Sequence, residues 1–155
     1  YDTGVGEFCE IEGLSLGPFD GPLPSFLILC KTALIDEYKD NITIFRWSLA
    51  ERRPVSEPWL NIPCETIFKN DAFCKDFRPS GIDRIDEDGS LLIVTAIGFS
   101  LVHISEEGRL IGTTQLDKNR HPQAEGVALM PDRRIVIADE AERAGSGRLS
   151  VFVPN

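Results

Sequence analysis

The chain repeats one short pattern three times, and this repeat limits its fold more than any other feature. Each copy has a small or acidic residue, then glycine, then an apolar residue, as in Glu12-Gly13-Leu14, Ser80-Gly81-Ile82 and Glu125-Gly126-Val127. A turn, a continuous apolar segment and a further apolar segment follow each copy. The glycines are 68 residues apart (13 to 81) and then 45 residues apart (81 to 126). The second spacing is that of a four-stranded propeller blade of about 40–50 residues.

The apolar segments between the turns predict β-strands. Segments 26–30, 42–47, 91–94 and 135–138 are short, rich in β-branched and aromatic residues, and bounded by glycine, proline or aspartate. Such runs are typical of strands rather than of amphipathic helices. The best helical candidate, 65–74, is short. We therefore predict an all-β protein.

The repeat predicts a partial β-propeller of about three four-stranded antiparallel blades, half of a six-bladed ring. The first blade covers about 9–62, the second 77–117 and the third 121–155. An insertion at 54–76 explains the longer first spacing, and fourth strands are expected near 59–62 and 110–116. The third blade is incomplete, because no fourth strand follows Phe152. Propellers have about 4–8 blades, so we expect the remaining blades before Tyr1, with association of chains as the alternative.

The charge of the chain disfavours two classes of partner. It has 25 acidic against 16 basic residues, a formal net charge of −9. Nucleic acids and anionic lipid surfaces both select positively charged proteins, so we expect no nucleic-acid partner. No apolar run approaches the roughly 18 residues of a transmembrane helix. Segment 1–7 lacks the features of a signal peptide, so either a signal has been removed or the chain begins inside a longer protein.

The cysteines leave two interpretations open. Two disulfides with three connectivities are one, and four reduced thiols are the other. One pair brackets a short irregular segment, and the other lies near the ends of two neighbouring strands. Neither histidine, His103 or His121, is near a cysteine motif, so the sequence predicts no structural zinc site. The four cysteines are Cys9, Cys30, Cys64 and Cys74.

Propeller geometry brings several of the repeat's polar residues to one mouth of the central channel. The innermost strands line this channel, so residues at their starts meet there. Equivalent positions in the three copies are Glu12, Ser80 and Glu125. Matching positions at the ends of the second strands extend this predicted ligand-binding set by Lys31, Thr95 and Glu140.

Three roles fit this set. Glu12 and Glu125 could hold Ca²⁺, which takes about 6–8 oxygen ligands. The same carboxylates, with His121 beside them, could act as general acid and base in a hydrolase. In the third interpretation, Glu12 and Glu125 tie blades together by accepting backbone N–H groups, with Lys31 as counter-ion. His103, on an alternating strand, is interpreted as a packed or surface residue.

Segment 121–127 has the sequence His-Pro-Gln-Ala-Glu-Gly-Val and resembles the motif P-Q-P-E-G-I of the SdiA-regulated family. Segments 10–14, 26–31, 77–82 and 88–95 are similar to further motifs of the C-terminal half of that family, in the same order. The resemblance covers most of the chain except 54–76. Ala124 departs from the commoner proline, and Asp139 from the commoner serine or asparagine.

The resemblance implies a bacterial β-propeller, related to NHL and phytase-like propellers, in the periplasm, cell envelope or extracellular space. The biochemical role of such proteins is undefined. We therefore expect a protein that binds a small ligand or a protein partner, with a Ca²⁺ site at the channel mouth. A phytase-like or lactonase-like hydrolase is the alternative, and a purely structural scaffold is the third hypothesis.

Overall fold

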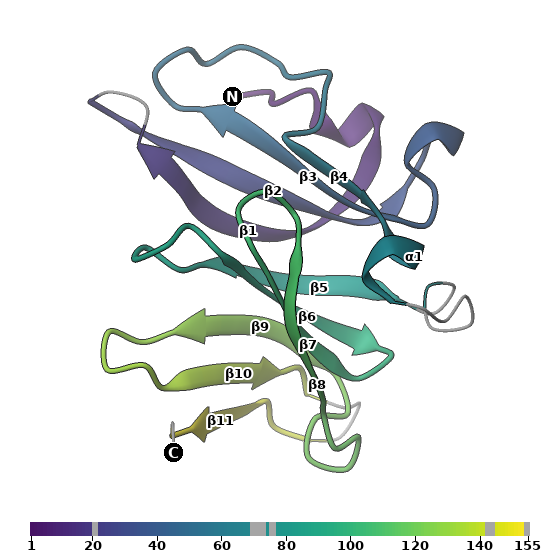
Figure 1. The fold of residues 1–155 in the computed structure, drawn as a ribbon, viewed down its shortest axis with the longest axis vertical. Coiled ribbons are helices and arrows are strands. Elements are labelled where there is room, and N and C mark those ends of the chain that lie inside the picture. Colours follow the sequence, from purple (N-terminus) through teal and green to yellow (C-terminus); the bar gives the residue numbers. More distant parts are fainter. Residues whose placement is uncertain (20–21, 69–73, 75–76, 142–144, 154–155) are drawn as a thin grey trace.

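Three antiparallel sheets stack along the long axis of the molecule (Figure 1). The computed structural model describes residues 1–19, 22–68, 74, 77–141 and 145–153. The first sheet contains β1 (Cys9–Phe19), β2 (Pro24–Ala33), β3 (Asn41–Ser48) and β4 (Leu60–Pro63). The second contains β5 (Arg78–Arg84), β6 (Leu91–Ile97), β7 (Ser100–Ile104) and β8 (Leu110–Gln115). The third contains β9 (Ala124–Leu129), β10 (Ile135–Asp139) and β11 (Arg148–Phe152).

Every strand pairs with its neighbour in sequence, so each sheet is a simple antiparallel meander. The short helices are η1 (Val5–Glu7), η2 (Asp36–Tyr38) and α1 (Cys64–Ile67). The prediction of an all-β protein is confirmed. Of the helical candidate at 65–74, α1 covers the start, whereas 69–73 lie outside the described residues. The fourth strand of the first sheet, β4, lies where we expected a fourth strand, near 59–62, and so falls inside the segment 54–76 that we assigned to an insertion.

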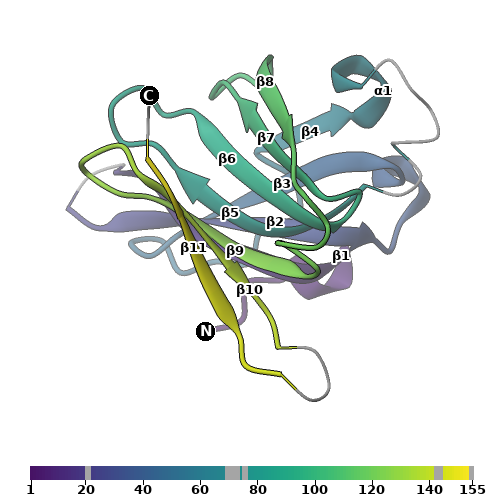
Figure 2. The same ribbon diagram turned by 90° about the horizontal axis from the view of Figure 1, so that it is seen from below.

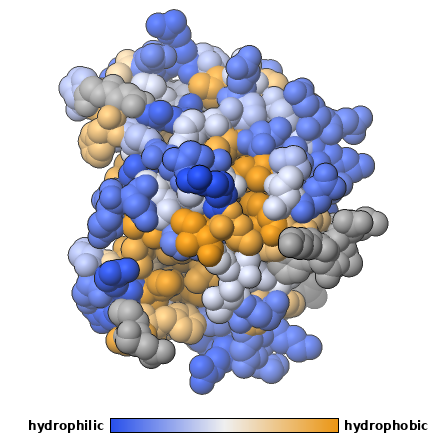
Figure 3. All heavy atoms as spheres, viewed as in Figure 1, coloured by the Kyte–Doolittle hydropathy of each residue, from blue (hydrophilic) through white to orange (hydrophobic). Residues whose placement is uncertain are grey.

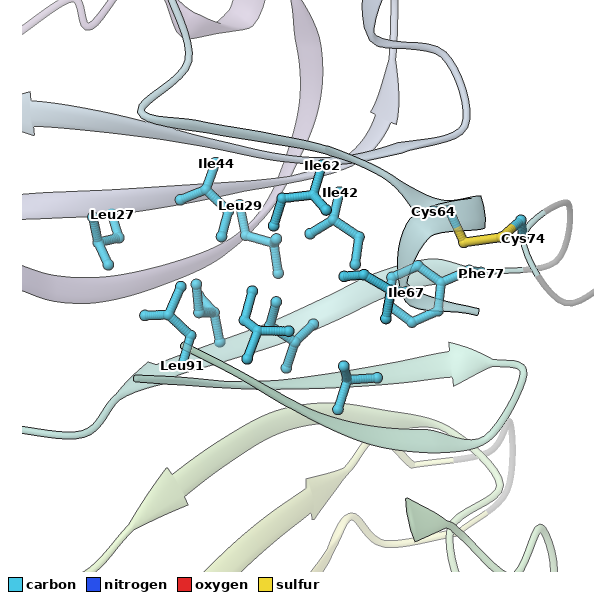
Figure 4. Packing of buried hydrophobic residues seen from close by; sticks show 14 residues of the cluster. Leu27, Leu29, Ile42, Ile44, Ile62, Cys64, Ile67, Cys74, Phe77 and Leu91 are labelled. Carbon is cyan, nitrogen blue, oxygen red and sulfur yellow. A yellow bond between two sulfur atoms is a disulfide. The ribbon is translucent and has the colours of Figure 1, made fainter. Parts of the chain in front are cut away.

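The largest core fills the space between the first and second sheets. Leu27, Leu29 and Ile44 of the first sheet face Leu91 and other apolar residues of the second (Figure 4). The continuous apolar runs of β2 and β6 are explained by this position, because both faces of these strands are covered. A smaller core lies between the second and third sheets, around Val94, Leu116, Ala124 and Ile137.

The repeated glycines allow the first strands of the sheets to approach closely. A Cβ atom built on Gly81 would lie 2.8 Å from the carbonyl oxygen of Glu125 and 3.0 Å from the Cα of Gly126. A Cβ atom on Gly13 would lie 3.0 Å from Ile82 Cγ2. Any side chain at these positions would push β1, β5 and β9 apart, so the contacts between sheets require the glycine of the repeat.

The cysteines form two disulfides, Cys9–Cys30 and Cys64–Cys74. The first joins β1 to β2, and the second joins α1 to Cys74 at the edge of the main core (Figure 4). Disulfides are typical of proteins that fold in oxidising compartments, such as secreted and periplasmic proteins. Within the described part of the chain, no helix has the length and apolarity needed to cross a membrane.

The stack does not close into a ring. The N-terminus lies at the first sheet and the C-terminal strand β11 belongs to the third, at opposite ends of the stack (Figure 1). Figure 2 looks along the stack, with the third sheet nearest the viewer. Apolar side chains remain exposed at both ends, among them Leu14 and Leu16 on β1 and Leu149 and Val151 on β11. Figure 3 shows further apolar residues across the middle and lower left of one face.

Candidate functional site

Charged side chains gather where β1 and β9 begin and where β2 and β10 end. The ammonium of Lys31 lies 2.9 Å from Glu12 Oε1, across the β1–β2 pair, and both side chains are partly exposed. The hydrogen bond with Glu12 raises the pKa of Lys31, and the charges of Glu12, Glu10 and Glu125 act in the same direction. Lys31 is therefore the positive centre of an otherwise acidic group.

Glu125, at the start of β9, belongs to the same group. Burial raises the pKa of its carboxyl, and the negative charges of Glu12 and Glu140 raise it further. A hydrogen bond from Gln123 and the charge of Lys31 lower the pKa in part. The first and third sheets thus bring two glutamates of the repeat within electrostatic reach of each other.

Glu140 follows β10 and is fixed by Gln123. Its Oε2 accepts a hydrogen bond of 2.6 Å from Gln123 Nε2, and its backbone N–H donates to the Gln123 carbonyl at 2.9 Å. We call the four residues that meet here the mouth cluster, namely Glu12, Lys31, Glu125 and Glu140.

The other two residues of the predicted set are buried and bonded within the sheets. The hydroxyl of Ser80 donates to the carbonyl of Ala124 at 2.5 Å and accepts from the N–H of Ala96 at 3.1 Å. The hydroxyl of Thr95 donates to the carbonyl of Ile97. Ser80 therefore joins the second sheet to the third, and neither hydroxyl faces the open surface.

His121 is paired with a residue that sequence reasoning did not select. Its Nδ1 lies 2.8 Å from Asp139 Oδ2, and both side chains are only 2% exposed. Its ring also contacts Phe152 of β11, with centroids 5.6 Å apart. The one signal for Asp139 in the sequence is its position directly after the apolar segment 135–138. Its pairing with His121 follows from the packing of β10 against the preceding loop.

Asp83 is a second important residue that the sequence analysis missed. Its Oδ2 accepts the backbone N–H of Leu129 at 2.7 Å, and its Oδ1 lies 3.5 Å from the hydroxyl of Ser15. This carboxylate therefore touches β1 and β9 from its place on β5. Burial raises its pKa, whereas the backbone N–H groups of Leu129 and Arg84 lower it. Asp83 holds the three sheets together at the opposite end from the mouth cluster.

His103 lies in a chain of hydrogen bonds near the β5–β6 turn. Its Nε2 is 2.8 Å from the hydroxyl of Ser90, which donates to Asp88 Oδ1 at 2.6 Å. This bond from Ser90 is the largest cause of the lowered pKa of Asp88. The three residues connect the turn to β7, and His103 itself is half-buried.

The donor set for Ca²⁺ is incomplete among the residues that the structure describes. No group of three or more histidine, cysteine, aspartate or glutamate side chains in these segments is placed to hold a metal ion. Glu12 is already engaged by the ammonium of Lys31. A Ca²⁺ ion at Glu12 and Glu125 would need most of its ligands from other sources, because it takes about 6–8 oxygens.

Comparison with known proteins places the fold but names no family. No family model matches the chain, and no curated protein matches it. A solved structure of a luciferin-regenerating enzyme, which is β-propeller-like, matches with a TM-score of 0.57 and 14% identity. The match covers 93% of this chain but 45% of that structure, so this chain spans less than half of its length. At this identity the likeness concerns the fold alone.

Proposed function

We propose that the chain is part of a β-propeller that binds a ligand or a protein partner at the mouth cluster. The observation that carries the proposal is the meeting of Glu12 and Lys31 of the first sheet with Glu125 of the third, whose charges act on one another in the folded chain. Burial of Glu125 raises its pKa, so folding makes the ionised form of this carboxyl less favourable. Such costly arrangements concentrate at functional sites.

The three sheets correspond to three blades of a ring of about six. The apolar faces left open at both ends of the stack support this count, because blades bury such faces against each other. The match to 45% of a propeller-like structure also supports it. We propose that the missing blades belong to polypeptide before Tyr1, with a second copy of the chain as the alternative.

We further propose membership of the SdiA-regulated family and a place in the bacterial periplasm or envelope. The motif resemblance around 121–127 supports the family. The two disulfides support an oxidising compartment.

The mouth cluster favours a cationic or strongly hydrogen-bonding occupant. Three carboxylates surround one ammonium, and the whole chain carries a net charge of −9. A positively charged segment of a partner protein would be attracted by this field. Ca²⁺ is a further candidate occupant, for which the cluster supplies only part of the ligands.

Calorimetric titrations test this proposal with two probes, Ca²⁺ and a lysine-rich peptide. We expect at least one probe to bind wild type and to bind Glu125→Gln more weakly. The matched control is Glu107→Gln. Glu107 is an exposed glutamate that pairs with Arg109 and does not belong to the mouth cluster. If Ca²⁺ gives no heat and leaves the melting temperature unchanged, the calcium site is excluded. If neither probe binds, the mouth cluster is not a binding site of this kind.

The raised pKa of Glu125 also favours a second candidate function, hydrolysis of phosphate esters or lactones. A glutamate that stays protonated to higher pH can act as a general acid. Turnover of a phosphate ester and of a lactone by wild type, lost in Glu125→Gln, would support it. Turnover that survives this substitution would exclude Glu125 as the acid.

A further inference from the structure

The contact that joins one sheet to the next is left half-made at each end of the stack. Inside the stack, the first strand of the next sheet crowds the glycine of each repeat. A Cβ atom on Gly13 would lie 3.0 Å from Ile82 Cγ2 of β5. A Cβ atom on Gly81 would lie 3.0 Å from the Cα of Gly126 of β9. A Cβ atom on Gly126 would meet only Ala138 of its own sheet among the described residues, at 3.4 Å. The place of a following first strand is therefore open at the third sheet.

A hydrogen bond from each sheet to the next follows the same rule. Ser15, two residues after the first glycine, accepts the backbone N–H of Arg84, three residues after the second. Asp83, two residues after the second glycine, accepts the backbone N–H of Leu129, three residues after the third. In the third sheet this position is Ala128, which is exposed. The rule therefore places Ala128 against the residue three positions after the glycine of a following sheet.

The first sheet presents the other half of the contact, at the opposite end of the stack (Figure 1). Leu14 follows the first glycine as Ile82 follows the second, yet Leu14 is 64% exposed. Leu16 is 55% exposed and holds the position of Arg84 and Leu129, three residues after the glycine. One end of the stack thus offers the glycine side of the contact, and the other end offers the apolar residues that pack against it.

The outer face of the third sheet is apolar across its three strands. The strand register pairs Val136 with Ala128 and Val151, and it pairs Ala138 with Gly126 and Leu149. Residues that are paired in this way share one face of a sheet. The six residues on this face are Gly126, Ala128, Val136, Ala138, Leu149 and Val151. Exposed apolar patches of this kind mark contacts with other proteins.

We propose that the third sheet takes up the first sheet of a second copy of this chain, head to tail. Leu14 of one copy then packs against Gly126 of the other, as Ile82 packs against Gly13 within the chain. Leu16 lies against Ala128 in the same contact. The contact continues, from copy to copy, the one that already joins the sheets of a single chain.

Two copies suffice to close such an arrangement. Head-to-tail contacts form a ring when the rotation between copies closes, and two stacks of three sheets give six sheets, within the usual range of about 4–8. One stack covers 45% of the propeller-like structure described above. The pairing rests on the ring proposed above and supplies its missing sheets from a second copy. The net charge of −9 on each copy opposes association, so single open stacks prevail at low concentration.

Sedimentation equilibrium of the whole chain measures the pairing, from about 1 μM to about 1 mM protein. We expect a monomer at the low end of this range and a dimer at the high end. Leu16→Asp and Ala128→Lys each place a charge in both contacts of the pair, where burial makes it costly. Each variant should therefore pair at least about tenfold more weakly than wild type. Both positions are exposed in the single chain, so we expect both variants to fold, and thermal denaturation checks this.

A mixture of the two variants tests the head-to-tail arrangement itself. In a mixed pair, one contact brings the carboxylate of Leu16→Asp against the ammonium of Ala128→Lys, and the other contact is wild type. The opposite charges complement each other, so we expect the mixture to pair about as tightly as wild type. The control is Ile111→Asp on β8, because Ile111 is exposed but belongs to the second sheet. This variant should pair as wild type does.

Three results would overturn the proposal. The first is a wild type that stays monomeric at about 1 mM, which would leave the open faces to sheets of another polypeptide. The second is a folded Leu16→Asp or Ala128→Lys variant that pairs as tightly as wild type. The third is a mixture that pairs no better than either variant alone. Calorimetry with Ca²⁺ and the lysine-rich peptide reports on the mouth cluster separately, so failure of the pairing and failure of the proposed function give different results.

Discussion

The first and third sheets are built on the same repeat but differ in how much of each is covered. One face of the first sheet packs on the second sheet, and its other face is partly covered by Val5 and Phe8 from the N-terminal segment. The third sheet has three strands, and among the residues that the structure describes only its face toward the second sheet is packed. Leu149 and Val151 point away from that packed face and remain exposed. The repeat therefore sets strand order, whereas burial depends on what lies next to each sheet.

The same comparison explains where the stack is open. Along β1, Gly13 and Ser15 face the second sheet, so Leu14 and Leu16 point the other way and stay exposed. In a closed ring, both open faces would pack against further blades. The predictions below test the contrast between covered and open sheets, in order of decreasing effect.

The largest difference is expected for one substitution made in both sheets. Leu29→Ala removes a side chain that is 0% exposed in the main core, and Leu149→Ala removes one that is 72% exposed. We expect Leu29→Ala to lower the free energy of unfolding by about 2–5 kcal/mol. Leu149→Ala should change it by less than about 0.5 kcal/mol. Chemical denaturation measures both, and equal losses would contradict the open third sheet.

A second contrast uses two glycines of the second sheet. Gly81→Ala places a methyl group against the backbone of β9, whereas Gly112→Ala on β8 meets nothing within 4 Å. Overpacking predicts a loss of about 1–3 kcal/mol for Gly81→Ala and little change for Gly112→Ala. A matching stability for the two variants in urea denaturation would show that the glycine is not needed for the contact between sheets.

Asp83 should matter through its hydrogen bonds rather than its charge. Asp83→Ala leaves the backbone N–H of Leu129 without its acceptor. We expect this loss to lower the free energy of unfolding by about 1–3 kcal/mol. Asp83→Asn retains an acceptor oxygen and should be clearly more stable than Asp83→Ala. The ranking of the two variants by thermal denaturation decides the matter, and the reverse order would exclude the hydrogen bond as the cause.

The smallest effect concerns pH and Glu125. Burial raises the pKa of this carboxyl above its ordinary value of 4.5, so the folded state holds its proton to higher pH than the unfolded state. The stability linked to this group is therefore fully present below about pH 4.5 and is lost as pH rises through the folded pKa. Glu125→Gln should remove this dependence. As pH rises from about 4.5 through the folded pKa, wild type should lose stability that the variant keeps, so the unfolding free energy of the variant should rise relative to that of wild type. Parallel pH profiles of the two proteins would contradict the assignment.

The fold was accessible from the sequence because it depends on local patterns. Alternating and continuous apolar runs mark the strands, and the Gly81 to Gly126 spacing gives the length of one sheet. The repeat also placed Glu12 and Glu125 at matching positions, and these two do interact. Cys64 and Cys74, which bracket a short segment of the sequence, form one of the two disulfides, so the disulfide interpretation of the cysteines is the one that holds.

Other features depend on contacts that no local pattern encodes. Ser80 and Glu12 occupy the same place in the repeat, yet the Ser80 hydroxyl is used between β5 and β9 while Glu12 reaches Lys31. Asp83 and Asp139 could not be selected because their partners, Leu129 and His121, are distant in sequence. These pairings follow from how the sheets pack.

Hydrogen–deuterium exchange of the backbone amides tests the central claim most directly, because it reports protection strand by strand. The structure predicts the slowest exchange in β2, β3 and β6, which are central strands with buried side chains. It predicts much faster exchange in β11, an edge strand of the open third sheet. Protection of β11 equal to that of β2 would contradict an open stack and would require a partner on the third sheet.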